Sequence, residues 1–380
     1  MNPISKIDLE FDAEHANLGE LKELRDGLSV AFQIGDTLWV ANDESVSLER
    51  LSLIKEKGKY RYGQHKQFLL ADYLKLPVPS PKDPADIEEV DVEGLAYGDG
   101  YLWLVGSHSL KRSNPTIEDG FKDAKKQLAK LSADGNRYLL ARIPLVEVDG
   151  TYSLMKQSPK PGKKRIAAQL QGSAQGNALT DALKGDKHLQ SFLTIPGKDN
   201  GFDIEGLAVV GARLLLGLRG PVLRGWAVIL EIEPEEDAKK PSILHLNPIG
   251  PKQRLYRKHF LQLGGLGIRD LCVQGSDILI LAGPTMDIDG PVTVFRWAGG
   301  ATAQKEECVV TADQLQPLLD VPYGKGVDHA EGMTLFSTDG ETAQSLLIVY
   351  DSAAENRQLK AHTMVADILP LPKTTAPAKA

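Results

Sequence analysis

Short apolar runs separated by tight turns recur along this chain. Residues 95–106 show the pattern, with an apolar Leu-Ala-Tyr stretch, a Gly-Asp-Gly turn and a Tyr-Leu-Trp-Leu-Val run. Similar pairs of runs occupy residues 207–216 and 271–281. Continuous apolar runs of this length, closed by turn signals, are typical of strands buried on both faces. We therefore expect an all-β protein made of repeated antiparallel strand pairs.

A short motif stands at the start of each strand pair: an acidic residue, a glycine, and a leucine or methionine. The residues at its first position, including a degenerate arginine copy, are Asp26, Glu93, Glu205, Arg269 and Glu331. Long-period self-similarity of this kind indicates a β-propeller, which is a ring of four-stranded blades. We expect a single propeller with five blades, and six is the competing count because the gap between the second and third copies is wide.

The remaining segments fit around this ring. Residues 7–11 alternate as a strand and the last repeat has three obvious strands, so we expect the N-terminal strand to join the last blade and close the ring. Residues 109–200 break the repeat, and residues 166–192 within them have helical spacing, which predicts a helical insertion in the second blade, lying as a lid over one face. The propeller then covers residues 1–369, and we expect the tail at 370–380 to be disordered.

Small residues line one face of the first strand in two repeats. Gly94 and Ala96, like Gly206 and Ala208, alternate with leucines and therefore share a face. Because blades are closest to one another near the axis, we expect this face to let the adjacent blade approach closely.

Composition narrows the possible partners and compartments. The formal net charge of −7 leaves no domain-wide basic face, so we expect no nucleic-acid partner. No apolar stretch approaches a membrane span, and the first ten residues lack the regions of a signal peptide, so we expect a cytoplasmic protein with no membrane segment. Cys272 and Cys308 are too few for a disulfide framework and are expected to be buried free thiols.

Residues 217–222 read Gly-Leu-Arg-Gly-Pro-Val. This segment resembles the distinguishing motif of a bacterial family known as domain of unknown function 3616, and the resemblance extends over most of residues 20–370. It implies a single folding unit and no particular activity. At the level of the fold only, the chain is also similar to calcium-dependent propeller hydrolases, namely lactonases, phosphotriesterases and propeller phytases.

The repeated acids precede the innermost strands, so we expect them to point toward one mouth of the central channel. Carboxylates gathered in this way share protons, pair with cations or bind a metal. Calcium suits such oxygen-rich sites. The candidate metal ligands are Asp26, Glu93, Glu205 and Glu331. Two structural alternatives are that these acids accept backbone N–H bonds from the next blade, or that they form salt bridges with Arg25, Arg219 or Arg269.

Arginines expected at the same mouth indicate a second possibility, the binding of an anionic ligand. A fixed guanidinium suits a phosphate or carboxylate ligand. The candidate residues for a small anionic ligand are Arg25, Ser107, Arg219 and Arg269. A three-residue turn at 211–213 would place Arg219 opposite Glu205, whereas a two-residue turn would put the two side chains on opposite faces. An internal pair between Arg219 and Glu205 is the structural alternative.

His108 and His329 are the candidate general bases, since imidazole titrates near neutral pH. Three functions follow from these residues. The first is a non-enzymatic module that binds a small anionic molecule, the second is a calcium-dependent hydrolase of an ester, lactone or phosphoester, and the third is a scaffold that engages a protein partner through the insertion or the rim.

Overall fold

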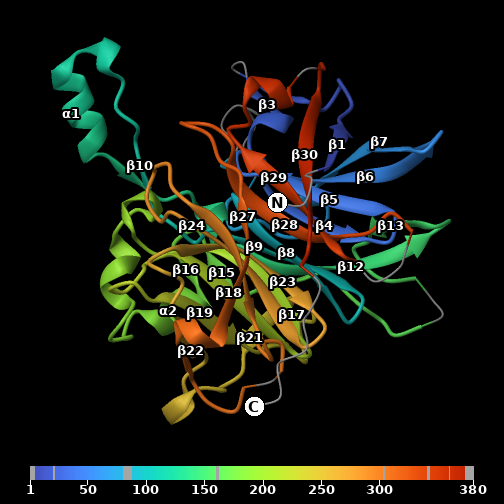
Figure 1. Cartoon of the computed structure of the whole chain (residues 1–380). Helices are drawn as coiled ribbons and strands as arrows, with labels where there is room; N and C mark the ends of the chain where they lie inside the picture. Colours follow the sequence, from blue (N-terminus) through green and yellow to red (C-terminus); the bar gives the residue numbers. More distant parts are fainter. Residues whose placement is uncertain are drawn as a thin grey trace.

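A computed structural model provides the structure of the chain (Figure 1). The residues that it describes are 5–19, 22–79, 88–159, 162–302, 304–339, 343–358 and 360–372. About half of them lie in β-strands, in a propeller-like arrangement of mainly antiparallel sheets. In this part of the chain, no helix has the length and apolar character needed to cross a membrane. Most of the predicted tail, residues 373–380, lies outside the described residues.

The strands form five antiparallel units within the described residues, here called units 1 to 5. Unit 1 consists of β4 (Leu28–Ile34), β5 (Thr37–Asn42), β6 (Ser47–Glu56) and β7 (Lys59–Leu69). Unit 2 consists of β8 (Val92–Gly98), β9 (Tyr101–Gly106), β12 (Leu140–Val148) and β14 (Ala168–Leu170). Unit 3 consists of β17 (Asp203–Val210), β18 (Arg213–Gly220), β19 (Ala227–Ile232) and β22 (Arg257–Leu261).

Unit 4 consists of β23 (Gly267–Gln274), β24 (Asp277–Gly283), β25 (Val292–Trp297) and β27 (Leu315–Val321). Unit 5 consists of β28 (His329–Phe336), β29 (Ser345–Asp351), β30 (Thr363–Pro370) and β1 (Ser5–Glu10). The strand predicted at residues 7–11 is thus present as β1, which pairs antiparallel with β30. Because β1 also pairs with β7 in parallel, units 5 and 1 form one eight-stranded sheet.

Short elements complete the chain. The remaining strands are β2 (Asn17–Gly19), β3 (Lys22–Glu23), β10 (Lys111–Arg112), β11 (Leu131–Ser132), β13 (Thr151–Leu154), β15 (Gly172–Ser173), β16 (Gly176–Asn177), β20 (Pro234–Glu236), β21 (Ile243–Leu246) and β26 (Val309–Val310). The α-helices are α1 (Phe121–Ala129) and α2 (Ala178–Leu183). The 3-10 turns are η1 (Leu24–Asp26), η2 (Leu70–Asp72), η4 (Ile117–Asp119), η5 (Gly135–Tyr138), η6 (Gln190–Thr194), η7 (Gly197–Asp199), η8 (Pro251–Gln253), η9 (Ala312–Gln314) and η10 (Glu355–Arg357).

Residues 109–200 are less helical than the sequence predicts. They supply β12 and β14, which are the third and fourth strands of unit 2, because apolar side chains of these strands are buried between units. The helical content expected over 166–192 is limited to the six-residue α2 and the short turn η6. The other helix, α1, belongs to an arm that leaves the body of the molecule (Figure 1).

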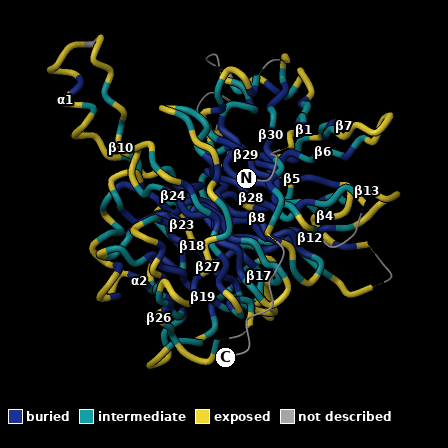
Figure 2. Tube along the Cα trace, viewed as in Figure 1, coloured by how far each residue is buried: buried dark blue, intermediate teal, exposed yellow. Residues whose placement is uncertain are grey.

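The first strands of the units pack against one another. β17 contacts β8 and β23, β28 contacts β23 and β4, and β4 contacts β8. Hydrophobic clusters fill the spaces between units, for example around Trp39 and Leu104 between units 1 and 2, and around Leu215 and Ile280 between units 3 and 4. Figure 2 accordingly shows the first strands buried and the exposed residues at the periphery. The first strands therefore share one central region.

Glycines permit this packing, as the alternation of small residues predicts. A Cβ atom on Gly94 would lie 2.6 Å from Cβ of Leu207 in unit 3, and a Cβ atom on Gly206 would lie 2.9 Å from Cγ of Leu271 in unit 4. Real side chains do not tolerate such distances without movement.

Replacing Gly206 by alanine is therefore expected to lower the free energy of unfolding by about 1–3 kcal/mol, because the added methyl group overpacks the interface between units 3 and 4. Chemical denaturation measures the change. Gly185→Ala is the matched control, because no heavy atom lies within 4 Å of its added Cβ. Equal effects of the two substitutions would contradict the packing explanation.

Candidate functional site

The same irregularity occurs near the start of every first strand. In each unit, the pairing of the first and second strands shifts by one residue at a β-bulge. The residues at the shift are Ser29, Glu93, Glu205, Arg269 and Glu331. Bulges redirect side chains and often lie beside functional sites. The bulge therefore shows which residues of the five units are structurally equivalent. In unit 1 the equivalent residue is Ser29, whereas the sequence motif indicates Asp26.

Asp26 and its neighbour Arg25 lie apart from this set. Asp26 ends the turn η1, and its carboxylate accepts hydrogen bonds from Gln358 and from the backbone N–H of Glu23. Arg25 lies 2.8 Å from the Glu23 carboxylate and donates to the carbonyl of Lys360. Neither residue lines the cavities described below. The repeat alignment of unit 1 was thus three residues out of register, and Ser29 bonds the carbonyl of Val92 in unit 2 instead.

Four bulge-region side chains form a continuous buried ion network. Arg219 Nη1 donates to Glu205 Oε1 at 2.7 Å, and Arg269 Nε lies 3.1 Å from Glu205 Oε2. Arg269 Nη2 also donates to Glu331. Glu205 therefore carries two arginine partners, and Arg269 links the carboxylates of units 3 and 5.

The contact between Glu205 and Arg219 depends on the bulge. The turn between β17 and β18 contains two residues, since Val210 pairs with Arg213. A regular ladder with that turn would place the two side chains on opposite faces. The register shifts twice here, so that Glu205 of β17 and Arg219 of β18 are both left out of the ladder, and these two side chains meet.

The two arginines are neutralised within the protein. Burial opposes the charge of Arg219, but Glu205 and Asp203 more than offset it and raise the pKa of Arg219 above its usual value. The remaining donors of Arg219 bond the carbonyl of Thr285 at 2.9 Å and that of Met286 at 3.5 Å, and Arg269 reaches the carbonyl of Pro284. A small anionic ligand therefore has no support here, because these guanidinium groups are already engaged.

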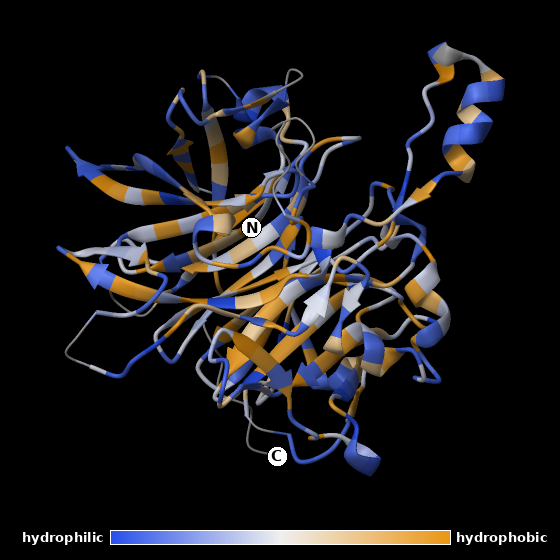
Figure 3. Ribbon diagram, turned by 180° about the vertical axis from the view of Figure 1, so that it is seen from behind, coloured by the Kyte–Doolittle hydropathy of each residue, from blue (hydrophilic) through white to orange (hydrophobic). Residues whose placement is uncertain are grey.

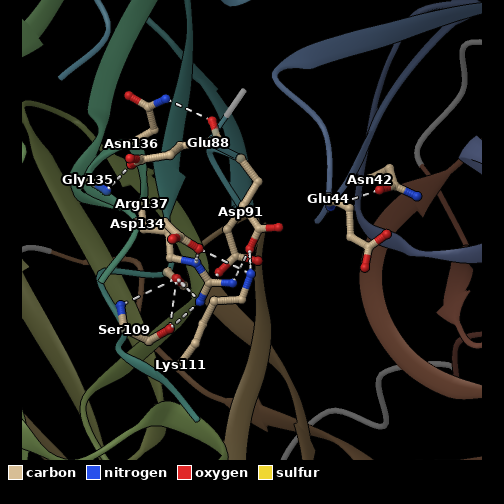
Figure 4. A network of polar contacts seen from close by, with 12 residues as sticks. Asn42, Glu44, Glu88, Asp91, Ser109, Lys111, Asp134, Gly135, Asn136 and Arg137 are labelled. Atoms are coloured by element: carbon tan, nitrogen blue, oxygen red, sulfur yellow. Dashed lines mark hydrogen bonds and ion pairs between the residues drawn. The ribbon is translucent and has the colours of Figure 1, made fainter. Parts of the chain in front are cut away.

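A second charged cluster lies beside unit 2 (Figure 4). Arg137, from the turn η5, lies 2.8 Å from the carboxylate of Asp91 and also pairs with Glu89. Lys111 pairs with Glu89 and lies 3.2 Å from Asp134. Although burial opposes it, the charges of Arg137 and Lys111 lower the pKa of Glu89. Burial raises the pKa of Asp91 in spite of Arg137.

Three further carboxylates have no cation within salt-bridge distance in the described part of the chain: Asp43, Glu93 and Asp203. Burial, followed by repulsion from neighbouring carboxylates, raises the pKa of each well above its usual value. Asp203 is 5% exposed, and its Oδ1 atom is buried without a hydrogen-bond partner. A buried carboxylate oxygen without a donor is costly, so a ligand that supplies a donor would be stabilised here.

These groups line two adjoining cavities of about 320 and 370 Å³. Arg219, Glu331 and Asp351 belong to the walls of both cavities, so together they form one mouth. The carboxylate residues around the larger cavity are Asp43, Glu44, Glu89, Asp91, Glu93, Asp199, Asp203, Glu205, Asp287, Glu331 and Asp351. The cationic residues there are Lys111, Arg112, Arg137, Lys198 and Arg219. Acidic residues therefore outnumber basic ones at the mouth.

His108 does not face these cavities. Its Nδ1 donates to the carbonyl of Gly106 at 2.7 Å, and its Nε2 accepts from the amide of Asn177 at 2.7 Å. Both ring nitrogens are thus engaged in holding α2 to unit 2. Its neighbour Ser107 is also buried, and its hydroxyl contacts Ser109 and Arg137. The structure therefore gives His108 a structural role in place of the predicted base.

Burial lowers the pKa of His108 to about 4, although the carbonyl of Gly106 acts in the opposite direction. Between pH 6.5 and 4 the unfolded chain takes up a proton that the folded chain does not, so stability falls as the pH falls through this window. We expect His108→Gln to remove this contribution. Denaturation of both proteins across the window measures it, and parallel pH profiles would contradict the assignment.

His329 lies at the rim of the smaller cavity, where its Nε2 is 3.4 Å from Asp289 Oδ1. It is therefore the only one of the two predicted bases that the structure places at the mouth. Within the described residues, His, Cys, Asp and Glu side chains form no group of three or more that could hold a metal ion. The predicted ligands Glu205 and Glu331 are paired with arginine instead.

Sequence reasoning missed Asp91 and Asp203, although the sequence contains a signal for them. Units 2 and 3 both begin with Asp-X-Glu-Gly-Leu, in which the aspartate precedes the repeated glutamate by two residues. In both units, the aspartate and the glutamate line the larger cavity. The longer motif therefore indicates paired carboxylates at the mouth.

A protein-family model described as "Protein of unknown function (DUF3616)" matches residues 27–367. No curated protein matches the chain significantly. Among solved structures, "YCF48 bound to D1 peptide" is 9% identical with a TM-score of 0.25, over 92% of this chain and 65% of that one. The tail fibre of Staphylococcus aureus phage P68 is 9% identical with a TM-score of 0.32, over 97% and 52%. This chain therefore spans less than two thirds of either protein.

A putative 6-phosphogluconolactonase from Bacteroides uniformis is 12% identical with a TM-score of 0.29. The alignment covers 89% of this chain and 68% of that one. With TM-scores of this size, none of these structures bears on the activity of the present chain.

Proposed function

This chain belongs to the DUF3616 family of proteins of unknown function, and we propose that its mouth binds a small organic cation. We also propose that residues 1–369 form one five-bladed propeller. The contacts among the five first strands and the pairing of β1 with β30 support that ring. In this arrangement the bulge residues of units 2 to 5 line the same mouth.

The observation that carries the proposal is the unpartnered Oδ1 atom of Asp203. Asp203 lines a cavity that also contains Glu93, whose pKa is raised by burial and by Asp91. An ammonium or guanidinium group in this cavity would donate hydrogen bonds to Asp203 and would neutralise the neighbouring carboxylates. Charge-assisted hydrogen bonds of this kind are among the strongest in proteins.

The dimensions of the mouth favour an organic cation over a single metal ion. Oxygen ligands must converge within about 2.3–2.6 Å of a calcium ion. The carboxylates here are spread around a cavity of about 370 Å³, a volume in the usual range for small organic ligands. A polyamine with several separated ammonium groups would meet more of them at once.

A calcium-dependent hydrolase of an ester, lactone or phosphoester is the second candidate. The type of ligand atom favours a calcium site, because Asp203 and Glu93 offer the oxygen atoms that calcium prefers. The described residues do not fit a metal ion as they stand, and the carboxylates would have to draw together around it. In this case His329, at the rim, would be the candidate general base.

Isothermal titration calorimetry with spermidine, calcium chloride and sodium phosphate separates the candidates. We expect saturable spermidine binding that weakens with added salt and is lost in Asp203→Asn. The exposed Glu235, on the outer strand β20, provides the control substitution Glu235→Gln. Calcium binding with ester hydrolysis that is lost in His329→Gln would favour the hydrolase. Phosphate binding that is lost in Arg219→Ala would overturn the cationic site.

A further inference from the structure

An arm formed by residues 111–132 projects from the rim of the mouth. It begins with β10, which pairs with β11, and it carries η4 and α1 between these two strands. Figures 1 and 3 show α1 at the end of this arm, well away from the body of the molecule. Residues 110–115 at its root line the larger cavity.

The arm exposes large apolar side chains. Phe121 is 80% exposed, and Ile117, Leu128 and Leu131 are also exposed. Figure 2 shows most of the arm as exposed. Apolar side chains gathered on a projecting element are typical of a surface that is covered by a partner.

The arm is also basic, although the whole chain carries a net charge of −7. The helix α1 and the residue after it contain four lysines: Lys122, Lys125, Lys126 and Lys130. Only Asp123 opposes them within the helix, and it pairs with Lys126. The arm therefore matches an acidic surface that also offers apolar contacts.

The mouth is such a surface. Beside its carboxylates, the smaller cavity has three exposed apolar residues in its wall, Met286, Ile288 and Tyr323. Asp287 lies between the first two of them. The mouth therefore combines negative charge with an apolar rim, which complements lysines that alternate with Phe121 and Leu128.

Ion pairs and hydrogen bonds fix the root of the arm. Arg112 Nε donates to Asp199 at 2.7 Å, and another nitrogen of Arg112 bonds the carbonyl of Leu128. Lys111 is held by Glu89 and Asp134. These contacts fix the root of the arm. Leu128 reaches the wall of the larger cavity of its own chain, whereas the four lysines of the arm line neither cavity and are therefore available to the mouth of a second molecule.

We propose that the arm of one copy docks across the mouth of a second copy, and that the second arm docks reciprocally to give a twofold-symmetric dimer. The lysines of the arm take the place of the organic cation, so this inference rests on the proposed function. Phe121 and the apolar rim exclude water around these charged contacts.

Sedimentation velocity on the full chain tests the dimer. We expect wild-type protein to dimerise at low ionic strength and to dissociate as salt is added. Phe121→Asp and the triple variant K122E/K125E/K126E should remain monomeric. Because α1 projects from the body, these changes should leave the thermal midpoint unchanged, which circular dichroism checks.

A charge exchange makes the test specific. The mouth variant Asp287→Lys should also be monomeric by itself, and mixing it with the triple arm variant should restore a heterodimer. Monomeric wild-type protein, or a dimer that persists in Phe121→Asp, would overturn the inference. Binding to anionic vesicles that is lost in Phe121→Asp, without dimers, would assign the arm to lipid and would equally overturn it.

The outcomes also separate this inference from the proposed function. A monomeric wild-type protein that binds spermidine would leave the cation site intact and remove the dimer. A dimer that needs the arm but is insensitive to Asp287→Lys would contradict docking at the mouth. If spermidine also fails to dissociate that dimer, the arm does not occupy the proposed cation site.

Discussion

Replacing Glu205 by glutamine is expected to lower the free energy of unfolding by about 3–5 kcal/mol. Glu205 lies between Arg219 and Arg269, and all three side chains are buried. The substitution leaves two buried guanidinium groups with one carboxylate, Glu331, between them. An uncompensated buried charge costs far more than the pair itself contributes. Urea denaturation at neutral pH measures the change.

Glu235→Gln provides the baseline, because Glu235 is exposed on β20. Its effect should stay within about 0.5 kcal/mol, as for most surface substitutions. A loss below about 1 kcal/mol for Glu205→Gln would show that solvent or a neighbouring group compensates the arginines. The buried network would then not hold the mouth together.

Replacing Asp203 by asparagine is expected to have two opposite effects. Spermidine affinity should fall about 10- to 100-fold, which corresponds to the 1.5–3 kcal/mol of a hydrogen bond to a charged group. The unliganded protein should become more stable at neutral pH, because one of the repelling buried carboxylates is removed. Calorimetry and thermal denaturation of the same preparation measure the two effects. Lower stability together with unchanged affinity would contradict both.

The pH dependence of stability follows from the same carboxylates. Burial and mutual repulsion raise the pKa values of Asp43, Glu93 and Asp203 in the folded chain. As the pH rises above about 4, the unfolded chain releases protons that the folded chain retains. The contribution of these groups to stability therefore falls as the pH rises toward their folded pKa values. Asp203→Asn should reduce this fall.

Much of the fold follows from local sequence signals. The alternating apolar runs and the Gly-Asp turns predict the strand pairs, because each pair is short and local in sequence. The glycines of the first strands predict the close packing of units, which depends only on side-chain size. The helix of the arm was missed, since most of its residues are exposed and only Ala124 is buried, so burial leaves little apolar pattern in its sequence.

The site was harder to predict because it depends on pairing register. Asp26 has the motif but not the bulge, so Ser29 takes its place. Glu205 meets Arg219 only because two register shifts leave both residues outside the ladder that a two-residue turn would give. The charge expected of the ligand also changed, from negative in the sequence-based prediction to positive in the present proposal. Arg219 and Arg269 are paired with carboxylates, which is the structural alternative that the sequence had also allowed. Asp203 and Glu93 remain without a cation in the part of the chain that the structure describes.

The most direct test of the cationic mouth is a crystal structure of the protein grown with spermidine at low ionic strength. We predict an ammonium nitrogen within hydrogen-bond distance of Asp203 Oδ1 and a second one facing Glu93. An anion held by Arg219 and Arg269 at the same mouth, with Asp203 still unpartnered, would contradict the proposal.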